Sequence, residues 1–379
     1  MKLSKKTNVG LTVALVAAAA VVITLLDLKI IGSTYVTNII KLSAIYALVG
    51  ASMNLVNGFT GLFSLGQAGF MAIGAYVVAM FTTDPSGRAG IYYVVPINPW
   101  LEQVQLPFPV ALILGGLVAA GLAYLIGAPV LRLKSDYLAI ATLGFAEIIR
   151  AVFQWQALGP VTNGANMITQ IPSFNNFNLT DGSGKVFLRL STFFPFLIAI
   201  LCIIVIVMLI NSSYGRAFKA IREDEIAAEA MGINLARHKQ MSFAIGAFFA
   251  AIGGGLLAVH LTAIDPNQFK IALTYELLLI VVLGGLGSVT GTVIGAFVYT
   301  AGKEWLRWCD NPLAIAGVQI PIFRSGLRMV IFSVLLMVIV LFYNRGLMGT
   351  SEFSWNGIFG TLQRWGKKLT GKVRKEAKE

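Results

Sequence analysis

Reactive side chains are scarce in this chain. Its 379 residues include only two cysteines and two histidines, and charged residues make up 12%. Cys202 lies inside a long apolar run, and Cys309 lies between two other apolar runs. The two cysteines do not have the spacing of a metal site or a disulfide framework. The sequence has no HExxH motif, and every Gly-Lys pair is followed by Val, Glu or Lys, never by the Ser or Thr of an ATP-binding loop. We therefore expect no metal, no cofactor and no enzyme activity.

Apolar residues are abundant instead. They make up 57% of the chain, and the mean hydropathy is +0.78. A helix needs about 20 apolar residues to cross roughly 30 Å of hydrocarbon. Ten stretches reach or approach that length, at 8–26, 35–56, 62–82, 107–131, 136–156, 191–211, 241–262, 271–286, 289–302 and 327–344. The sequence thus predicts an all-α polytopic membrane protein with about ten transmembrane helices.

The eighth and ninth stretches decide the topology, because only Gly287 and Ser288 separate them and they could form one long broken helix over 271–302. Cytoplasmic segments of membrane proteins carry an excess of Lys and Arg. With a cytoplasmic N-terminus and ten crossings, the inner segments hold more than twice as many basic residues as the outer ones. Nine crossings would place the basic end of the chain outside. We therefore predict two short spans, two cytoplasmic termini and a periplasmic loop at 157–190.

The net charge of +12 follows from the same asymmetry. The basic residues flank spans or lie in 346–379, and they do not form a groove with stacking aromatic residues. This pattern favours membrane lipid as a partner and does not indicate nucleic acid. We predict a transmembrane domain over 1–345 and a basic cytoplasmic tail over 346–379.

A dense charged block, Ser213 to Arg237, separates two long uncharged stretches. Within it Phe218, Ile221, Ala228 and Met231 fall on one side at helical spacing. An apolar side with oriented charges is typical of a helix that docks on another protein, so we predict a cytoplasmic coupling segment over 212–240. The alternative is a solvated helix that only connects two spans.

Glycine and a few polar residues mark candidate positions inside the membrane. The 39 glycines collect at 58–74, 253–255 and 284–295, where helices would pack closely or break. The candidates for pathway lining or helix packing are Ser64, Gln67, Gly69, Glu276, Gly287 and Gly291. Capping or interhelical bonding would explain Ser64 and Gln67 equally well. Glu147 and Arg150 predict an ion pair on one helix face, whereas Glu276 has no obvious local partner.

Four runs in this order resemble the permease subunits of branched-chain amino-acid ABC importers, and the resemblance extends from about residue 40 to 345. The runs are Ser64 to Tyr76, Leu131 to Gly144, Gly215 to Glu225 and Leu283 to Gly291. The third run is similar to that of the longer, M-type permease. The resemblance implies a bacterial inner-membrane protein that forms half of a translocation pathway. It also implies a shorter, H-type permease partner, two ATPase subunits and a periplasmic binding protein.

The resemblance gives the charged block a role in coupling to the ATPase. The residues concerned are Gly215, Arg216, Phe218, Ile221, Arg222, Glu223, Asp224, Ala228, Met231 and Gly232. The candidates for contacts made by the periplasmic loop are Thr162, Asn163, Gly164 and Asn166. There Asn163 and Met167 stand where the family has glycine, and Asn adopts a positive φ far more readily than Met does.

Two alternatives stay open. Permeases of urea or short-chain amide importers share much of this pattern, and a permease for other amino acids is a further alternative, so the substrate does not follow from the resemblance. A self-powered secondary transporter belongs to a different class, and it would require paired acids or a proton relay within the membrane.

Overall fold

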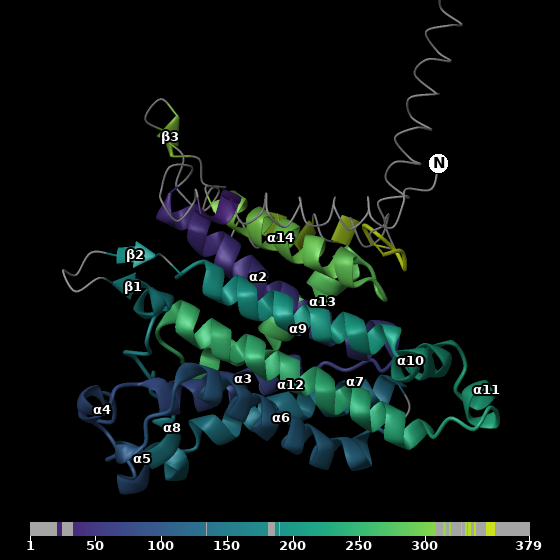
Figure 1. Cartoon of the computed structure of the whole chain (residues 1–379), viewed down its shortest axis with the longest axis horizontal. Helices are drawn as coiled ribbons and strands as arrows, with labels where there is room; N and C mark the ends of the chain where they lie inside the picture. Colours follow the sequence, from purple (N-terminus) through teal and green to yellow (C-terminus); the bar gives the residue numbers. More distant parts are fainter. Residues whose placement is uncertain are drawn as a thin grey trace, which may run out of the picture.

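Long helices lying side by side form most of the molecule (Figure 1). The computed structural model describes residues 33–133, 135–180, 186–188, 190–307 and 346–352, together with 21–24 and scattered positions between 314 and 338. The long helices are α2 (Thr34–Asn54), α3 (Gln67–Thr82), α6 (Phe108–Val130), α7 (Ser135–Gln154), α9 (Phe193–Asn211), α12 (Leu235–Leu261), α13 (Ile271–Gly284) and α14 (Val289–Trp305). A π-helical turn, η1 (Leu55–Phe59), continues α2.

Short elements gather at the two ends of the helix bundle. One end carries α4 (Pro85–Ile91), α5 (Pro99–Gln103), η2 (Gln156–Leu158), α8 (Gly159–Thr162), η3 (Phe174–Phe177) and the antiparallel pair β1 (Leu179–Thr180) and β2 (Val186–Leu188). The other end carries α10 (Ser213–Glu223) and α11 (Glu225–Ala230). A short turn, η4 (Pro266–Phe269), precedes α13, and β3 (Ala314–Ile315) pairs with β4 (Val318–Gln319).

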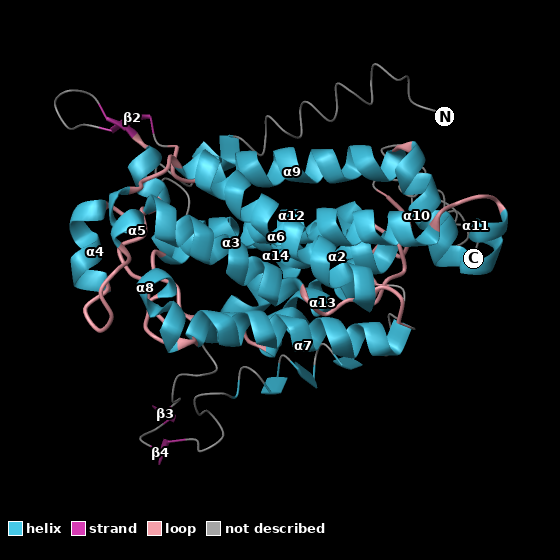
Figure 2. Cartoon of the chain, turned by 90° about the horizontal axis from the view of Figure 1, so that it is seen from below, coloured by secondary structure: helices cyan, strands magenta, loops and turns pink. Residues whose placement is uncertain are grey.

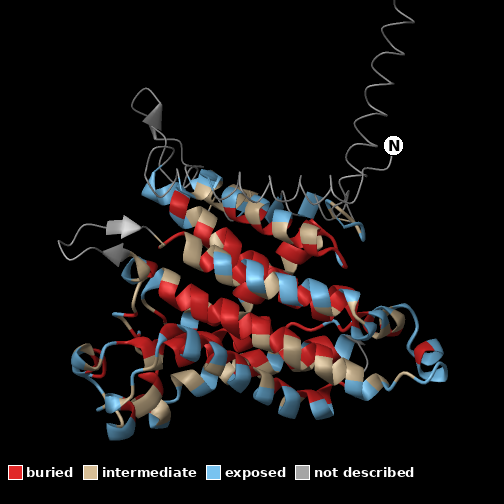
Figure 3. Ribbon diagram, in the orientation of Figure 1, coloured by how far each residue is buried: buried red, intermediate tan, exposed pale blue. Residues whose placement is uncertain are grey.

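Burial separates central from peripheral helices. In α12 and in α2 with η1, 83% of the most apolar window is buried, against 22% in α9. α12 packs against α3 and α6, while α7 and α9 lie on opposite faces of the bundle (Figure 2). Buried residues follow α12 and exposed ones the outer side of α9 (Figure 3). An apolar helix with an exposed apolar side is what a lipid-facing span requires.

The predicted spans correspond to helices over most of their described length. Eight of the ten stretches coincide with the long helices, whereas 8–26 and 327–344 lie largely outside the described residues. Within the described part, four helices are long and apolar enough to cross a membrane, and a fifth span results if α7 is joined to the bent turn that follows it. The all-α membrane fold is confirmed, and the count of ten stays a prediction.

The interrupted pair is confirmed as two helices. α13 ends at Gly284 and α14 begins at Val289, and the two pack side by side. A Cβ placed on Gly295 would lie only 2.7 Å from the carbonyl oxygen of Ile280, so the backbones are in close contact. Gly285 and Gly287, at φ values of 119° and 90°, form the turn between them.

The third predicted span is wrong in its first part, because 62–66 is not helical and the helix starts only at Gln67. Side chains replace the helical hydrogen bonds in this segment. The Asn57 amide donates to the Ser64 carbonyl at 3.1 Å and accepts from the Ser64 N–H at 3.2 Å, and Leu65 N–H donates to the Thr142 hydroxyl at 2.9 Å. Non-helical backbone inside the helix bundle is tolerated because side chains of the protein satisfy its polar groups.

Candidate coupling site

The charged block forms the helices α10 and α11, and the first residues of α12 lie at its end. A side chain caps each start, since Ser212 accepts from Gly215 N–H, Asp224 from Ile226 N–H at 2.8 Å, and Asn234 from Arg237 N–H at 3.0 Å. Asp224 itself is extended, at a φ of −159°, and so separates α10 from α11. Gly232, at a φ of 84°, follows the end of α11. The predicted segment 212–240 therefore includes the first turns of α12.

The apolar side of the block faces the chain's own bundle. Phe218 is fully buried, and Ile221 and Ala228 are 2% and 3% exposed. Met231 is 83% exposed, so its predicted place on this side is wrong. The reason is the break at Asp224, which ends the helical spacing that related Met231 to Phe218. Ile226, which the sequence analysis did not single out, is 82% exposed beside it on the outer surface.

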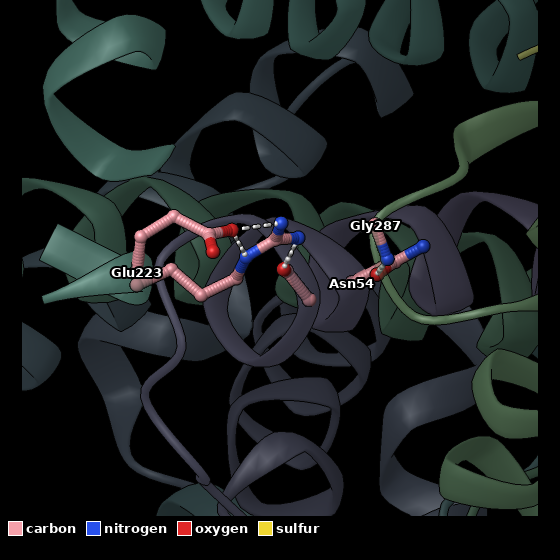
Figure 4. A network of polar contacts seen from close by, with 5 residues as sticks. Asn54, Glu223 and Gly287 are labelled. Carbon is pink, nitrogen blue, oxygen red and sulfur yellow. Dashed lines mark hydrogen bonds and ion pairs between the residues drawn. The ribbon is translucent and has the colours of Figure 1, made fainter. Parts of the chain in front are cut away.

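Arg222 ties α10 to the end of α2 (Figure 4). Its Nη1 donates to the carbonyl oxygen of Gly58 at 2.9 Å, and its Nη2 lies 2.5 Å from the carboxylate of Glu223. The side chain passes between two glycines, because a Cβ on Gly61 or Gly287 would come within 2.9 or 2.8 Å of it. A cation at the carbonyl end of a helix is favourable, so this contact both orients α10 and completes η1.

Asn54 holds the turn between α13 and α14 against α2 (Figure 4). Its amide nitrogen donates to the Ser288 carbonyl at 2.9 Å and to the Thr292 hydroxyl at 2.7 Å, and its oxygen accepts from Gly287 N–H at 2.9 Å. Arg222 and Asn54 together connect α10, η1 and the α13–α14 turn. Polar contacts thus link α10 directly to η1, and link α2, which η1 continues, to the α13–α14 turn.

A segment from the predicted tail completes this site. Leu347 N–H and Met348 N–H donate to the carbonyls of Leu283 and Gly284, at 2.8 and 3.1 Å, at the end of α13. The Glu352 carboxylate accepts from Val289 N–H at 2.7 Å and from the Thr290 hydroxyl at 2.6 Å, at the start of α14. Residues 346–352 thus cap both helices of the pair. No sequence pattern pointed to Glu352, because its partners lie about 60 residues away.

The two carboxylates that the sequence analysis singled out, Glu147 and Glu276, belong to ion pairs. Glu147 contacts Arg150 at 2.7 Å, as predicted, and its second oxygen accepts from Ile271 N–H. Glu276 contacts Lys303 of α14 at 2.6 Å. Glu276 has no partner within its own helix, as expected from the sequence, because its partner lies on the next helix, which folds back beside α13. Within the described residues no three His, Cys, Asp or Glu side chains are grouped as a metal site.

The predicted packing glycines lie at close helix contacts. A Cβ on Gly69 would come within 2.8 Å of the Cα of Ala146, and one on Gly291 within 2.3 Å of the Gly284 carbonyl oxygen. Ser64 is buried in the non-helical segment before α3. Gln67 is buried at the start of α3, and its side-chain oxygen has no partner among the described residues.

The candidate loop residues stabilise the loop from inside. Thr162 and Asn163 are buried, and the Asn163 amide donates to the carbonyls of Ile91 and Met167 at 3.2 and 3.0 Å. Asn163 has a φ of 60°, whereas Met167 has no positive φ. Gly164, at a φ of 58°, is also buried, and Asn166 donates its N–H to the Asn163 carbonyl. Burial argues against Thr162, Asn163 and Gly164 as direct contacts with another subunit.

The same end of the bundle contains a buried cation. Arg88 is 1% exposed and donates to the carbonyls of Thr83, Leu101, Glu102 and Val104. Burial lowers the pKa of Arg88. Burial also raises the pKa of Tyr92 to about 12, and its hydroxyl donates to the Val161 carbonyl at 2.8 Å. These bonds fix α4 and α5 against the 157–190 loop.

The comparison with known proteins matches this architecture. Residues 35–341 match the family model described as the branched-chain amino acid transport system permease component. The chain belongs to this family. It is 35% identical over 289 residues to the high-affinity branched-chain amino acid transport system permease protein LivM of Escherichia coli (strain K12). The aligned region covers 71% of the chain and 63% of that protein. The chain thus spans just under two thirds of that relative's length.

More distant relatives include both permease types. A probable branched-chain amino acid transport permease protein LivM of Methanocaldococcus jannaschii is 26% identical over 319 residues, which is 80% of the chain and 90% of that protein. The high-affinity permease protein LivH of Salmonella typhimurium is 26% identical over 265 residues, or 69% of the chain and 81% of that protein. No solved structure gives a significant match. The family is one of membrane permeases and not of enzymes.

Proposed function

We propose that this chain is the M-type permease subunit of an ABC importer for branched-chain amino acids. It forms half of the translocation pathway with an H-type permease, receives substrate from a periplasmic binding protein and is driven by two ATPase subunits. The similarity to LivM and LivH proteins supports this assignment. The 157–190 loop faces the periplasm, and the end with α10 and α11 faces the cytoplasm together with both termini.

The arrangement of α10 and α11 is the observation that carries the proposal. Their inner side is buried in the bundle, Arg222 bonds to Gly58, and Ile226 and Met231 are exposed at the end of the molecule. An ATPase that changes shape needs a rigid element to push on, and this segment is fixed to α2 and to the α13–α14 turn. We propose that the ATPase binds the outer side, around Ile226 and Met231, and not the buried side that contains Phe218.

The ion pairs of Glu147 and Glu276 support an ATP-driven importer over a secondary transporter. A proton-coupled transporter requires acids that exchange protons along a path. Here each carboxylate is held within 2.7 Å of a cation.

Reconstitution tests this function. The chain is co-expressed with an H-type permease, the ATPase subunits and the binding protein, and the complex is placed in proteoliposomes. We expect leucine-loaded binding protein to stimulate both ATP hydrolysis and leucine uptake, while urea and acetamide are not transported. Uptake by the chain alone, driven by an ion gradient, would contradict the proposal. ATP-driven uptake of urea or an amide would overturn the substrate assignment only.

A further inference from the structure

A cavity of about 450 Å³ lies beside the coupling segment. It is formed by the end of α9, by α10, by the start of α14 and by the segment that caps α14. Its lining includes Val207, Ile210, Lys219, Arg222, Thr290 and Glu352. The cavity therefore borders on every element that the coupling site joins, and it lies next to a membrane-spanning helix.

The charges in the cavity favour a phosphate group. Both oxygens of Glu352 accept hydrogen bonds from the start of α14, and Arg222 is paired with Glu223. Lys219 has no ion pair among the described residues, and its ammonium group lies 5.6 Å from the centroid of the Phe59 ring. Lys219 is thus an exposed cation on the wall of the cavity, with no ion pair among the described residues, which suits a phosphate.

The walls of the cavity favour a ligand with apolar chains. Val207 and Ile210 lie in the last turns of α9, whose neighbouring residues Ile204, Val205 and Met208 are 48%, 52% and 66% exposed. A cavity that presents an unpaired lysine at the end of an exposed apolar helix suits the binding of an anionic lipid headgroup at the membrane surface. Free phosphate or a nucleotide would gain nothing from the apolar wall.

We propose that this cavity binds the headgroup of an anionic phospholipid, with the phosphate on Lys219 and the acyl chains along α9. A bound headgroup would lie between α10 and α14, so it would brace the coupling segment against the α13–α14 pair. This inference concerns a ligand of the chain itself, and it holds whatever the transported substrate is.

Native mass spectrometry of the purified full-length chain, with dioleoyl phosphatidylglycerol added in detergent, tests the proposal. We expect Lys219→Ala to weaken binding of the tightest lipid about tenfold, while Lys219→Arg binds as the original does. Arg216→Ala is the matched control, because Arg216 lies exposed on the same helix and does not line the cavity. Equal binding by the original chain and Lys219→Ala would overturn the proposal, as would an equal loss in Arg216→Ala.

A second variant tests the cavity without changing its charge. Val207→Trp fills the apolar wall, and we expect it to exclude the lipid while the thermal stability of the purified chain is retained. Inorganic phosphate at millimolar concentration distinguishes the two sources of a phosphate group. We expect it not to displace the lipid. Displacement by phosphate, or full lipid binding by Val207→Trp, would contradict a phospholipid site.

Discussion

Arg222 donates a hydrogen bond to the carbonyl oxygen of Gly58 across 164 residues of sequence. Through this bond the exposed coupling segment contacts the end of a central helix, one turn from the Asn54 side chain that binds the α13–α14 turn. The connection from α10 to the bundle interior therefore consists of two polar side chains and the backbone they bind.

Removal of the Arg222 contact should impair coupling more than folding. We expect Arg222→Ala to lower the free energy of unfolding by about 1–3 kcal/mol, as for a hydrogen bond to a charged group. The ratio of leucine transported to ATP hydrolysed should fall several-fold in proteoliposomes. Arg222→Lys should be intermediate, because one ammonium cannot replace the planar guanidinium. Arg237→Ala, at an exposed position on α12, is the control, and an equal loss of coupling there would contradict this role for Arg222.

Two classes of substitution distinguish the outer from the inner side of the coupling segment. Ile226→Asp and Met231→Asp should leave the yield and monodispersity of the permease unchanged but release the ATPase during purification, since burial of apolar surface contributes about 25 cal/mol per Å². Phe218→Asp places a carboxylate among buried groups and should reduce the yield of folded permease itself. Size-exclusion chromatography with and without the ATPase measures both effects. Full ATPase retention by Ile226→Asp and Met231→Asp together would show that the outer side is not the docking surface.

The close helix contacts predict where a larger side chain is tolerated. Gly69→Leu and Gly291→Leu should destabilise the purified chain, because their side chains would overlap backbone atoms of α7 and α13. Gly144→Leu and Gly121→Leu are matched controls, since no atom lies within 4 Å of a Cβ at either position. Thermal melting monitored by size-exclusion chromatography compares the four. Equal melting temperatures would rule out the packing role of Gly69 and Gly291.

The proposed orientation can be tested by labelling in spheroplasts. After both native cysteines are replaced, Asn175→Cys in the 157–190 loop should react with an impermeant thiol reagent added outside. Glu229→Cys in α11 should react only after the membrane is opened. Both positions are exposed, so access to the side chain is not limiting. Labelling of Glu229→Cys from outside would reverse the topology.

The lengths of the apolar runs alone located the long helices, because each helix needs a run of about 20 apolar residues to cross the membrane. It also located the α13–α14 turn, where Gly287 and Ser288 interrupt the run. Hydropathy did not reveal the non-helical segment before α3, since Leu62, Phe63 and Leu65 are as apolar as the residues of the helix that follows. The break there depends on hydrogen bonds from Asn57 and from Thr142, which is distant in sequence.

The sequence predicted where the candidate site lies in the chain, but not which of its side chains are exposed. The charged block lies where expected, yet helical spacing across Asp224 placed Met231 on the wrong side. Asp224 caps the helix that follows it, and a capping aspartate within a charged run is hard to distinguish from a solvated one. Glu276 and Lys303 pair because α14 folds back on α13, which composition does not reveal.

The position of Glu352 determines when the start of α14 becomes fully hydrogen-bonded during synthesis. The chain reaches Val289 63 residues before it reaches the carboxylate that accepts the Val289 N–H. The α13–α14 pair must therefore enter the membrane with its turn incompletely bonded and wait for the last part of the described chain. A cut placed ahead of residue 352 would therefore leave the start of α14 without its capping carboxylate.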